Sequence, residues 1–254
     1  MRSRNSSKKG TNVDRALYAA ATGMAAQQKN LDTIAANLAN ADVTGFKRSS
    51  MRFTALAAGD GGAIGVASLG KRLVFGQGKL LKTGGPFDCA ISGPGFFIVC
   101  DDRGRHAYTR DGSFERAADG SLRDRRGWRL EGIRIPADAV KVRVARDGRV
   151  SAQTTHGTRE LGRIRLAVFP APERLHPIAG TLLAASPASG AARTIDATAI
   201  GKPQIRFGML EASNVSVVEE MMAILGAQRA YEANAKGVQA ADEMLRIADN
   251  LNRG

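Results

Sequence analysis

The sequence is poor in cysteine, tryptophan and histidine. Its 254 residues include two cysteines, one tryptophan and three histidines, and aromatic residues make up only 5% of the chain. Two cysteines exclude a scaffold held together by several disulfides, and Cys89 and Cys100 lack the neighbouring ligands of a zinc site. We therefore expect both cysteines to pack as small apolar side chains.

Long apolar runs are also missing. The chain has no stretch of about eighteen uncharged apolar residues, so we expect no membrane-spanning helix and no membrane insertion. Residues 1–12 are polar and basic with no apolar segment behind them, so no cleaved secretory signal is expected. With 43% hydrophobic residues, the chain is apolar enough to fold around a core.

Acidic residues are outnumbered by basic ones, and the formal net charge is +13. Residues 1–12 carry +4 of this charge, whereas the last forty residues sum to −2. The excess therefore lies in the middle, where arginine and aspartate alternate closely between Arg103 and Arg149. Surfaces that bind single-stranded nucleic acid interleave basic residues with aromatic ones for stacking, and here Trp128 is the only tryptophan. We therefore interpret these basic residues as parts of solvated strands and turns. A basic nucleic-acid or anionic-surface binding protein is the alternative function from another class.

The sequence has no complete catalytic or cofactor motif. Residues 65–72 match the spacing of a phosphate-binding loop until the last position, where Arg72 replaces the required Ser or Thr hydroxyl. The three histidines, His106, His156 and His176, are too far apart to show metal-ligand spacing. We expect no enzymatic activity, no cofactor and no metal.

A seven-residue repeat marks the N-terminal part of the chain. The repeat consists of Leu17, Met24, Leu31 and Leu38, with Ala21, Gln28 and Ala35 at the intermediate positions. Such spacing predicts an amphipathic helix with a heptad stripe, from about Asp14 to about residue 41. Asp14 is the predicted N-cap, and Thr44-Gly45 is the predicted stop.

The C-terminal part repeats this pattern. Its stripe consists of Val217, Met221, Ile224, Gln228, Tyr231, Ala235, Val238, Ala241, Leu245 and Ala248. We expect a helix that is capped by Asn214 and ends near Asn252. One such helix usually covers a core. Two heptad helices at opposite ends of a chain instead favour an antiparallel coiled-coil pair that offers a face to neighbouring copies.

Short apolar runs and tight turns fill the middle of the chain. The runs include residues 96–99, 140–144 and 164–168, and Asp-Gly pairs punctuate them at 111–112, 119–120 and 147–148. The predicted fold class is α+β, with long terminal helices in a coiled-coil pair and a β-rich middle domain. The predicted divisions are a basic tail at 1–12, an N-terminal helix and loop at 13–54, a flexible connection at 55–65, a β-rich outer domain at 66–208 and a C-terminal helix at 209–254.

Several stretches resemble the flagellar rod and hook family of axial proteins, and together they span the chain from Val13 to Asn252. They are residues 15–24, 30–40 and 44–48 near the N-terminus, 93–97 and 108–114 in the middle, and 210–221, 228–231 and 240–245 near the C-terminus. The most specific are Ala-Asn-Leu-Ala-Asn at 36–40 and Tyr-Thr-Arg-Asp-Gly-Ser-Phe at 108–114. We interpret the second as a structural strand and turn of the outer domain.

The resemblance implies a structural subunit of the bacterial basal-body rod. Its terminal helices would line the inner tube of a hollow helical shaft that transmits torque to the hook, with the β-rich domain outside. Homo-oligomers, other rod proteins, the hook protein, envelope rings and the flagellar type III export apparatus are the implied partners, and the cell envelope is the implied location. The resemblance favours the distal part of the rod. The short stretch between Phe53 and Gly76 keeps the proximal part as the alternative.

The resemblance also bears on individual residues. Family members begin near Val13, which suggests that residues 1–12 come from a mis-called start. The expected assembly interface consists of Leu17, Met24, Leu31, Leu38, Asn37, Asn40, Ile224, Tyr231, Val238 and Leu245. Asn37 and Asn40 are three residues apart on one helix and are predicted to hydrogen-bond within or between subunits; an exposed face with a C-terminal cap is the alternative.

Overall fold

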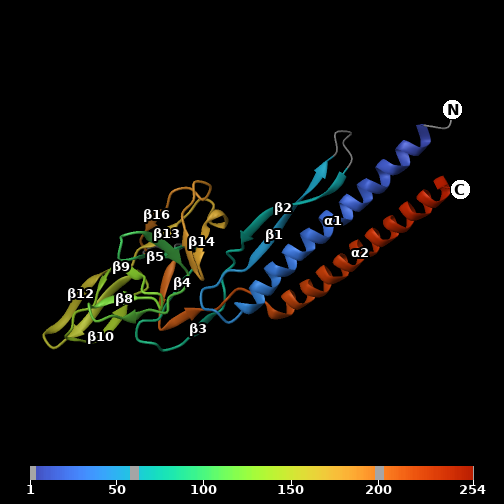
Figure 1. Ribbon diagram of the computed structural model, residues 1–254. Helices are drawn as coiled ribbons and strands as arrows, with labels where there is room; N and C mark the ends of the chain where they lie inside the picture. The colour runs from blue at the N-terminus through green and yellow to red at the C-terminus, as the bar shows by residue number, and fades with distance from the viewer. Residues whose placement is uncertain (1–3, 58–62, 198–202, 254) are drawn as a thin grey trace. The chain divides into compact units, whose positions relative to one another are not determined.

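The computed structural model describes residues 4–57, 63–197 and 203–253. The chain forms two compact units (Figure 1). The helical unit comprises residues 1–39, 49–72 and 216–254, and the β-rich unit comprises residues 40–48 and 73–215. No helix among the described residues is long and apolar enough to cross a membrane.

Two long helices and a hairpin build the helical unit. Helix α1 spans Arg4–Ala39 and α2 spans Val217–Arg253, and strands β1 (Ser49–Ala57) and β2 (Ala63–Leu73) form a two-stranded sheet. The helices lie side by side and are antiparallel, and the hairpin lies along α1 (Figure 1). Helix α1 begins ten residues before Asp14, so the predicted N-cap there is wrong.

Small residues allow the two helices to approach closely. A Cβ atom added to Gly23 of α1 would lie 2.8 Å from Nδ2 of Asn234 on α2. A Cβ atom on Gly237 of α2 would lie 3.9 Å from that of Ala20. Apart from Ile34, the most buried helix residues are likewise short or polar: Ala26, Thr33 and Asn37 in α1, and Glu220, Ala227 and Ala241 in α2.

The predicted fold class is wrong in its coiled-coil pair, while the α+β division broadly fits. A heptad seam should bury both of its positions, but Ala21, Gln28 and Ala35 are all exposed. In α2 the stripe residues Val217, Met221, Gln228 and Tyr231 are exposed as well. The physical reason is that α1 has two neighbours, α2 and the β1–β2 hairpin, so its buried positions follow these two contacts and not a single heptad stripe.

The hairpin occupies much of the segment predicted to be a flexible connection. Strand β1 reaches residue 57 and β2 starts at residue 63, and residues 58–62 lie outside the described part of the chain. The Thr22 hydroxyl of α1 accepts a hydrogen bond from the backbone N–H of Val66 at 3.2 Å. Because β2 is a strand through residues 65–72, the helix that a phosphate-binding loop requires is absent there.

The β-rich unit contains sixteen strands among its described residues. They are β3 (Leu80–Lys82), β4 (Cys89–Ser92), β5 (Phe96–Cys100), β6 (His106–Thr109), β7 (Glu115–Arg116), β8 (Ser121–Arg123), β9 (Arg129–Arg134), β10 (Ala139–Val144), β11 (Arg149–Thr154), β12 (Gly157–Arg163), β13 (Leu166–Val168), β14 (His176–Ala179), β15 (Leu182–Ala184), β16 (Arg193–Ile195), β17 (Gln204–Phe207) and β18 (Met209–Glu211). The largest sheet has the order β14-β15-β6-β5-β9-β8-β7. Strand β13 also pairs with β5, and β16 pairs with β13. Strands β10-β11-β12 form a second antiparallel sheet, and β17 pairs with β4 and β18 with β3.

Strand β5 is buried along its whole length, so it organises the core. The Phe97 and Phe114 rings meet edge to face at 5.5 Å, and on the other side of β5 the Phe96 ring meets that of Phe169 at 5.9 Å. Cys89 and Cys100 are free thiols that are buried in β4 and β5, which confirms that they pack as core residues. Burial raises the pKa of the Cys89 thiol to about 12.

Candidate functional site

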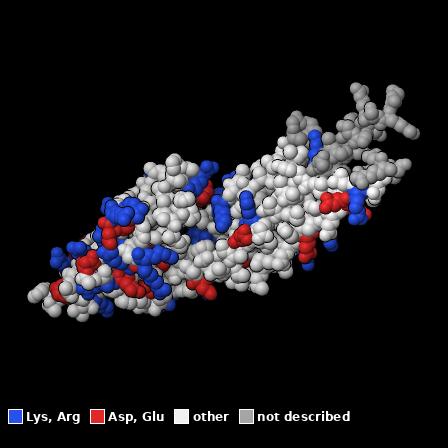
Figure 2. Space-filling model, in the orientation of Figure 1, with Lys and Arg blue, Asp and Glu red and all other residues white. Residues whose placement is uncertain are grey.

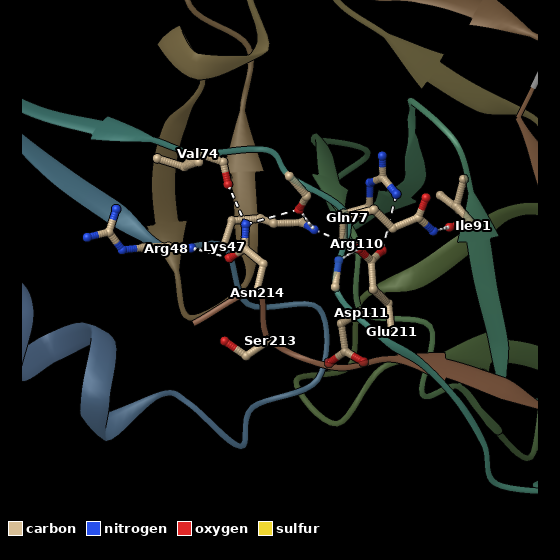
Figure 3. Close-up of polar contacts among 12 residues, drawn as sticks. Lys47, Arg48, Val74, Gln77, Ile91, Arg110, Asp111, Glu211, Ser213 and Asn214 are labelled. Carbon is tan, nitrogen blue, oxygen red and sulfur yellow. Dashed lines mark hydrogen bonds and ion pairs between the residues drawn. The ribbon is translucent and has the colours of Figure 1, made fainter. Parts of the chain in front are cut away.

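The chain passes between the two units after residues 39, 48, 72 and 215. Inside the β-rich unit, the segments next to these passages are joined by a group of polar side chains with three buried charged residues at its centre. We call this group the junction network, and its members are Lys47, Gln77, Arg110, Glu211 and Asn214 (Figure 3). It brings together four parts of the chain: residues 45–48, 74–79, 110–111 and 211–214.

Glu211, the last residue of β18, lies at the centre of the network. One of its carboxylate oxygens, Oε1, accepts hydrogen bonds from Lys47 Nζ at 2.6 Å and from the Gly78 N–H at 2.8 Å. The other, Oε2, accepts one from Arg110 Nη1 at 3.1 Å. All three charged side chains are at most 5% exposed. A single carboxylate thus holds two cations and a backbone amide away from water.

The network contains one more positive than negative charge. Burial lowers the pKa of Lys47 despite the opposing effect of Glu211, and burial likewise lowers the pKa of Arg110. Backbone carbonyl oxygens accept further hydrogen bonds from both cations: Lys47 Nζ donates to Gly76 O at 2.9 Å, and Arg110 Nη2 donates to Gly93 O at 2.8 Å. The Arg110 guanidinium also lies over the Phe96 ring, 5.5 Å from its centroid.

Asn214 joins three segments through hydrogen bonds to the backbone. Its Oδ1 accepts the Arg48 N–H at 2.7 Å, and its Nδ2 donates to Val74 O at 2.7 Å and Gly76 O at 3.0 Å (Figure 3). The predicted role of Asn214 as the α2 N-cap is therefore wrong. Ser216 takes that position, where its Oγ accepts the Glu219 N–H at 3.4 Å.

Two glycines allow the joined segments to approach closely. Gly45 has a φ of +69°, and its N–H donates to Glu211 O at 2.7 Å. A Cβ atom there would collide with the backbone of Asp111, and a Cβ atom on Gly78 would collide with the carbonyl oxygen of Ala212. These positions therefore require glycine. Gly45 was predicted to stop the first helix, but α1 ends at Ala39.

The predicted assembly residues fall into three groups of exposure. Leu17, Met24, Leu31, Leu38, Asn40, Ile224, Val238 and Leu245 are half-buried, Asn37 is buried and Tyr231 is 39% exposed. Asn37 Nδ2 donates to Ser49 O at 2.8 Å and to Glu220 Oε2 at 3.1 Å, and its Oδ1 accepts the Ser49 N–H at 2.9 Å. Its amide therefore connects α1, β1 and α2 inside the subunit.

The first turns of α2 expose a group of large apolar side chains. We call this group the α2 apolar face: Val217, Val218, Met221, Met222 and Leu225. Their exposed fractions range from 45% to 67%. At helical spacing these residues share one side of α2, opposite the buried Glu220 and Ala227. On the face shown in Figure 2, charged side chains of both signs are dense over the β-rich unit and sparse along much of the helices.

Among the described residues, no group of three or more His, Cys, Asp or Glu side chains could hold a metal ion. A groove of about 370 Å³ in the β-rich unit is lined mainly by glycine and apolar residues, with Arg116 and Lys141 as the charged members of its described lining. This lining includes no carboxylate and no nucleophilic side chain.

Sequence reasoning missed the junction network, although the stretches that carry the family resemblance contain its central members. Lys47 lies in the stretch 44–48, Arg110 in 108–114, and Glu211 and Asn214 in 210–221. Their place within these stretches was the available signal, but it did not show that the three charges would meet.

Three family models match this chain. The model described as flagella basal body rod protein matches residues 17–47, the flagellar hook protein FlgE/F/G D1 domain matches 90–152, and the flagellar basal body rod FlgEFG protein C-terminal model matches 207–251. Lys47, Arg110 and Glu211 thus come from three different matched segments.

Curated relatives match over almost their full lengths. The flagellar basal-body rod protein FlgG of Borreliella burgdorferi is 36% identical over 94% of this chain and 99% of its own. In Caulobacter vibrioides, FlgG is 35% identical over 93% of this chain and 98% of its own, and FlgF is 34% identical over 93% and 97%. The chain belongs to the flagellar rod and hook family of axial proteins, as the resemblance indicated. It is a structural subunit of the bacterial flagellar basal-body rod.

Proposed function

We propose that the protein forms the distal part of the rod, where copies assemble into a hollow helical shaft that transmits torque to the hook. Support for the distal position comes from relatives named FlgG, the distal rod protein, that cover more than nine-tenths of this chain. The rod family assembles into the basal body together with other rod components. The hook protein and the envelope rings are the neighbours that a distal position implies, and the flagellar type III apparatus is the implied export route.

The observation that carries the assembly proposal is the α2 apolar face. Five large side chains on one side of a helix are exposed in the isolated subunit, and water contact with them is unfavourable by about 25 cal/mol per Å² of apolar area. A second copy of the same chain is the proposed cover. Further proposed interface residues are the exposed Tyr231 of α2 and the half-buried Leu17, Met24, Leu31, Leu38, Ile224, Val238 and Leu245.

A polymerisation assay tests this proposal. Met221→Glu places a charge in the middle of the α2 apolar face, so we expect the critical concentration for filament formation to rise at least tenfold. Gln153→Glu makes the same change in charge at an exposed position of β11 and serves as the matched control. Pelleting and electron microscopy give the readout. Equal polymerisation of both variants would contradict the proposed interface.

The position in the rod needs a separate experiment, because a FlgF protein is 34% identical to this chain and the proximal part of the rod is the alternative. His156 is exposed beside the turn between β11 and β12, whereas both native cysteines are buried. A His156→Cys variant labelled with biotin and gold marks the subunit in isolated basal bodies. We expect gold next to the hook. Gold at the opposite end of the rod would assign the protein to the proximal part.

A further inference from the structure

We propose that Glu211 is the positioning residue of this rod subunit: it holds in register, through the junction network, the chain segments that enter and leave the helical unit. The inference rests on the proposed function, because positioning matters for a subunit that is built into a shaft. It goes beyond that function by assigning a role to a residue that is fully buried inside the subunit.

The network reaches every chain segment that lies next to a passage between the units. The residues that precede or follow the four passages between units are 40–48, 73–79 and 211–215 on the side of the β-rich unit. Glu211 contacts the first segment through Lys47 and through its own carbonyl, which accepts the Gly45 N–H. It contacts the second through the Gly78 N–H, and it belongs to the third. One residue thus touches all three segments.

Arg110 anchors this group to the β-sheet core. It follows directly after β6, and it joins Glu211 to the Gly93 carbonyl in the β4–β5 turn. Gln77 makes a second link to the same turn, where its Nε2 donates to Ile91 O at 2.8 Å and its Oε1 accepts the Gly93 N–H at 3.0 Å. The segments are therefore fixed to the core as well as to one another.

Burial distinguishes the two ion pairs of Glu211 from the other ion pairs of the unit. Every other described ion pair of the β-rich unit includes a side chain that is at least 38% exposed, and such surface pairs contribute little. The pairs of Glu211 with Lys47 and Arg110 are almost fully buried. A buried pair adds modest stability on its own, but removal of one partner is strongly destabilising, since a charge is left without its counterion.

Glu211 carries the negative charge that both buried cations share. Glu211→Gln keeps an acceptor for the Gly78 N–H but leaves Lys47 and Arg110 as two buried cations of like charge. We expect this variant to loosen the three segments and to lower Tm by about 10 °C. Lys47→Met in the Glu211→Gln background restores the original net charge of the network. We therefore expect the double variant to regain part of the lost Tm, although each single change is destabilising.

Amide hydrogen exchange of the full-length monomer separates positioning from general stability. In Glu211→Gln we expect exchange at least tenfold faster at Gly45, Gly78 and Ala212, while amides of β5 keep their protection. The matched control is Leu182→Ala, which creates a cavity in the β-rich core. Its exchange should accelerate in the core without selectivity for the three segments. If Glu211→Gln does not fold, Asn214→Ala removes neutral hydrogen bonds instead, and it should selectively accelerate exchange at Arg48.

Two results would overturn the proposal: exchange that rises uniformly across the β-rich unit in Glu211→Gln or Asn214→Ala, or a double variant that is less stable than Glu211→Gln. Both measurements use the monomer, so they do not depend on polymerisation. Normal polymerisation of the Met221→Glu variant would contradict the proposed assembly interface alone. The results for Glu211 could still be interpreted.

Discussion

The two units bury different kinds of side chain. The core of the β-rich unit consists of large apolar residues, and Phe97, Leu130 and Leu166 are at most 1% exposed. The helical unit buries Ile34 together with alanine, threonine and a polar pair, Asn37 and Glu220, and the α2 apolar face is exposed. The difference teaches that large apolar side chains form the core of the β-rich unit within one subunit, whereas the helical unit has an exposed apolar face, for which we propose neighbouring copies as the cover.

The largest expected effect compares the same kind of truncation in both units. Phe97→Ala removes a fully buried ring and should cost about 3–5 kcal/mol of unfolding free energy. Met221→Ala removes an exposed side chain and should change the monomer by less than about 0.5 kcal/mol. Urea unfolding of the two monomers measures both. Similar losses would break the comparison, because they would show that the α2 apolar face is already covered in the monomer.

Asn37 tests whether polar contacts hold the helical unit together. Asn37→Leu removes two hydrogen bonds to Ser49 and one to the buried Glu220 carboxylate, and it should cost about 2–4 kcal/mol. Thermal melting followed by the helical circular-dichroism signal is the measurement. Gln28→Leu, at an exposed α1 position, serves as the control and should stay within about 0.5 kcal/mol of the parent. Equal losses of unfolding free energy in both variants would contradict a stabilising role of the Asn37–Glu220 pair.

Alkaline pH should weaken the β-rich unit through Cys89. The pKa of its buried thiol is raised to about 12 from 9.0, so the folded state retains a proton that the unfolded state has lost. The stabilisation is complete below pH 9 and is lost as pH rises through 12. At pH 10.5 the wild type should have lost about 2 kcal/mol more than Cys89→Ala, each relative to its own stability at pH 8. Parallel pH profiles of the two proteins would contradict this.

The smallest effect concerns two helix glycines. Gly226→Ala adds a methyl group with no neighbour within 4 Å and should stabilise the monomer by about 0.5–1 kcal/mol through helix propensity. Gly23→Ala gains the same propensity, but its Cβ atom would press on the Asn234 side chain. We expect the second variant to be less stable than the first by about 1 kcal/mol in urea titrations. The same gain in stability in both variants would contradict the close approach of α1 and α2 at Gly23.

The sequence predicted what periodicity and turn chemistry can specify. Both terminal helices are present, and the predicted strands at 96–99 and 140–144 appear as β5 and β10. The Asp119-Gly120 turn forms as expected, with Gly120 at a φ of +79° and the Ser121 N–H donating to Asp119 Oδ1 at 3.0 Å. These features depend on neighbours in sequence, which a pattern records.

Features that depend on distant partners were not predictable. The heptad pattern could not show that α1 would divide its buried surface between α2 and a hairpin, so the coiled-coil pair was wrong. Asn214 has the chemistry of an N-cap, but its amide is used by backbone groups about 140 and 165 residues away in sequence. Lys47, Arg110 and Glu211 lie more than sixty residues apart in sequence, and only the fold brings their charges together.

The central claim is that the α2 apolar face is exposed in the monomer and covered in the rod. A Met221→Cys variant measures this directly, because the native thiols of Cys89 and Cys100 are buried. Maleimide labelling is compared between the purified monomer and intact basal bodies from cells that carry the variant. We predict rapid labelling of the monomer and at least tenfold slower labelling in the rod. Equal labelling in both states would contradict the claim.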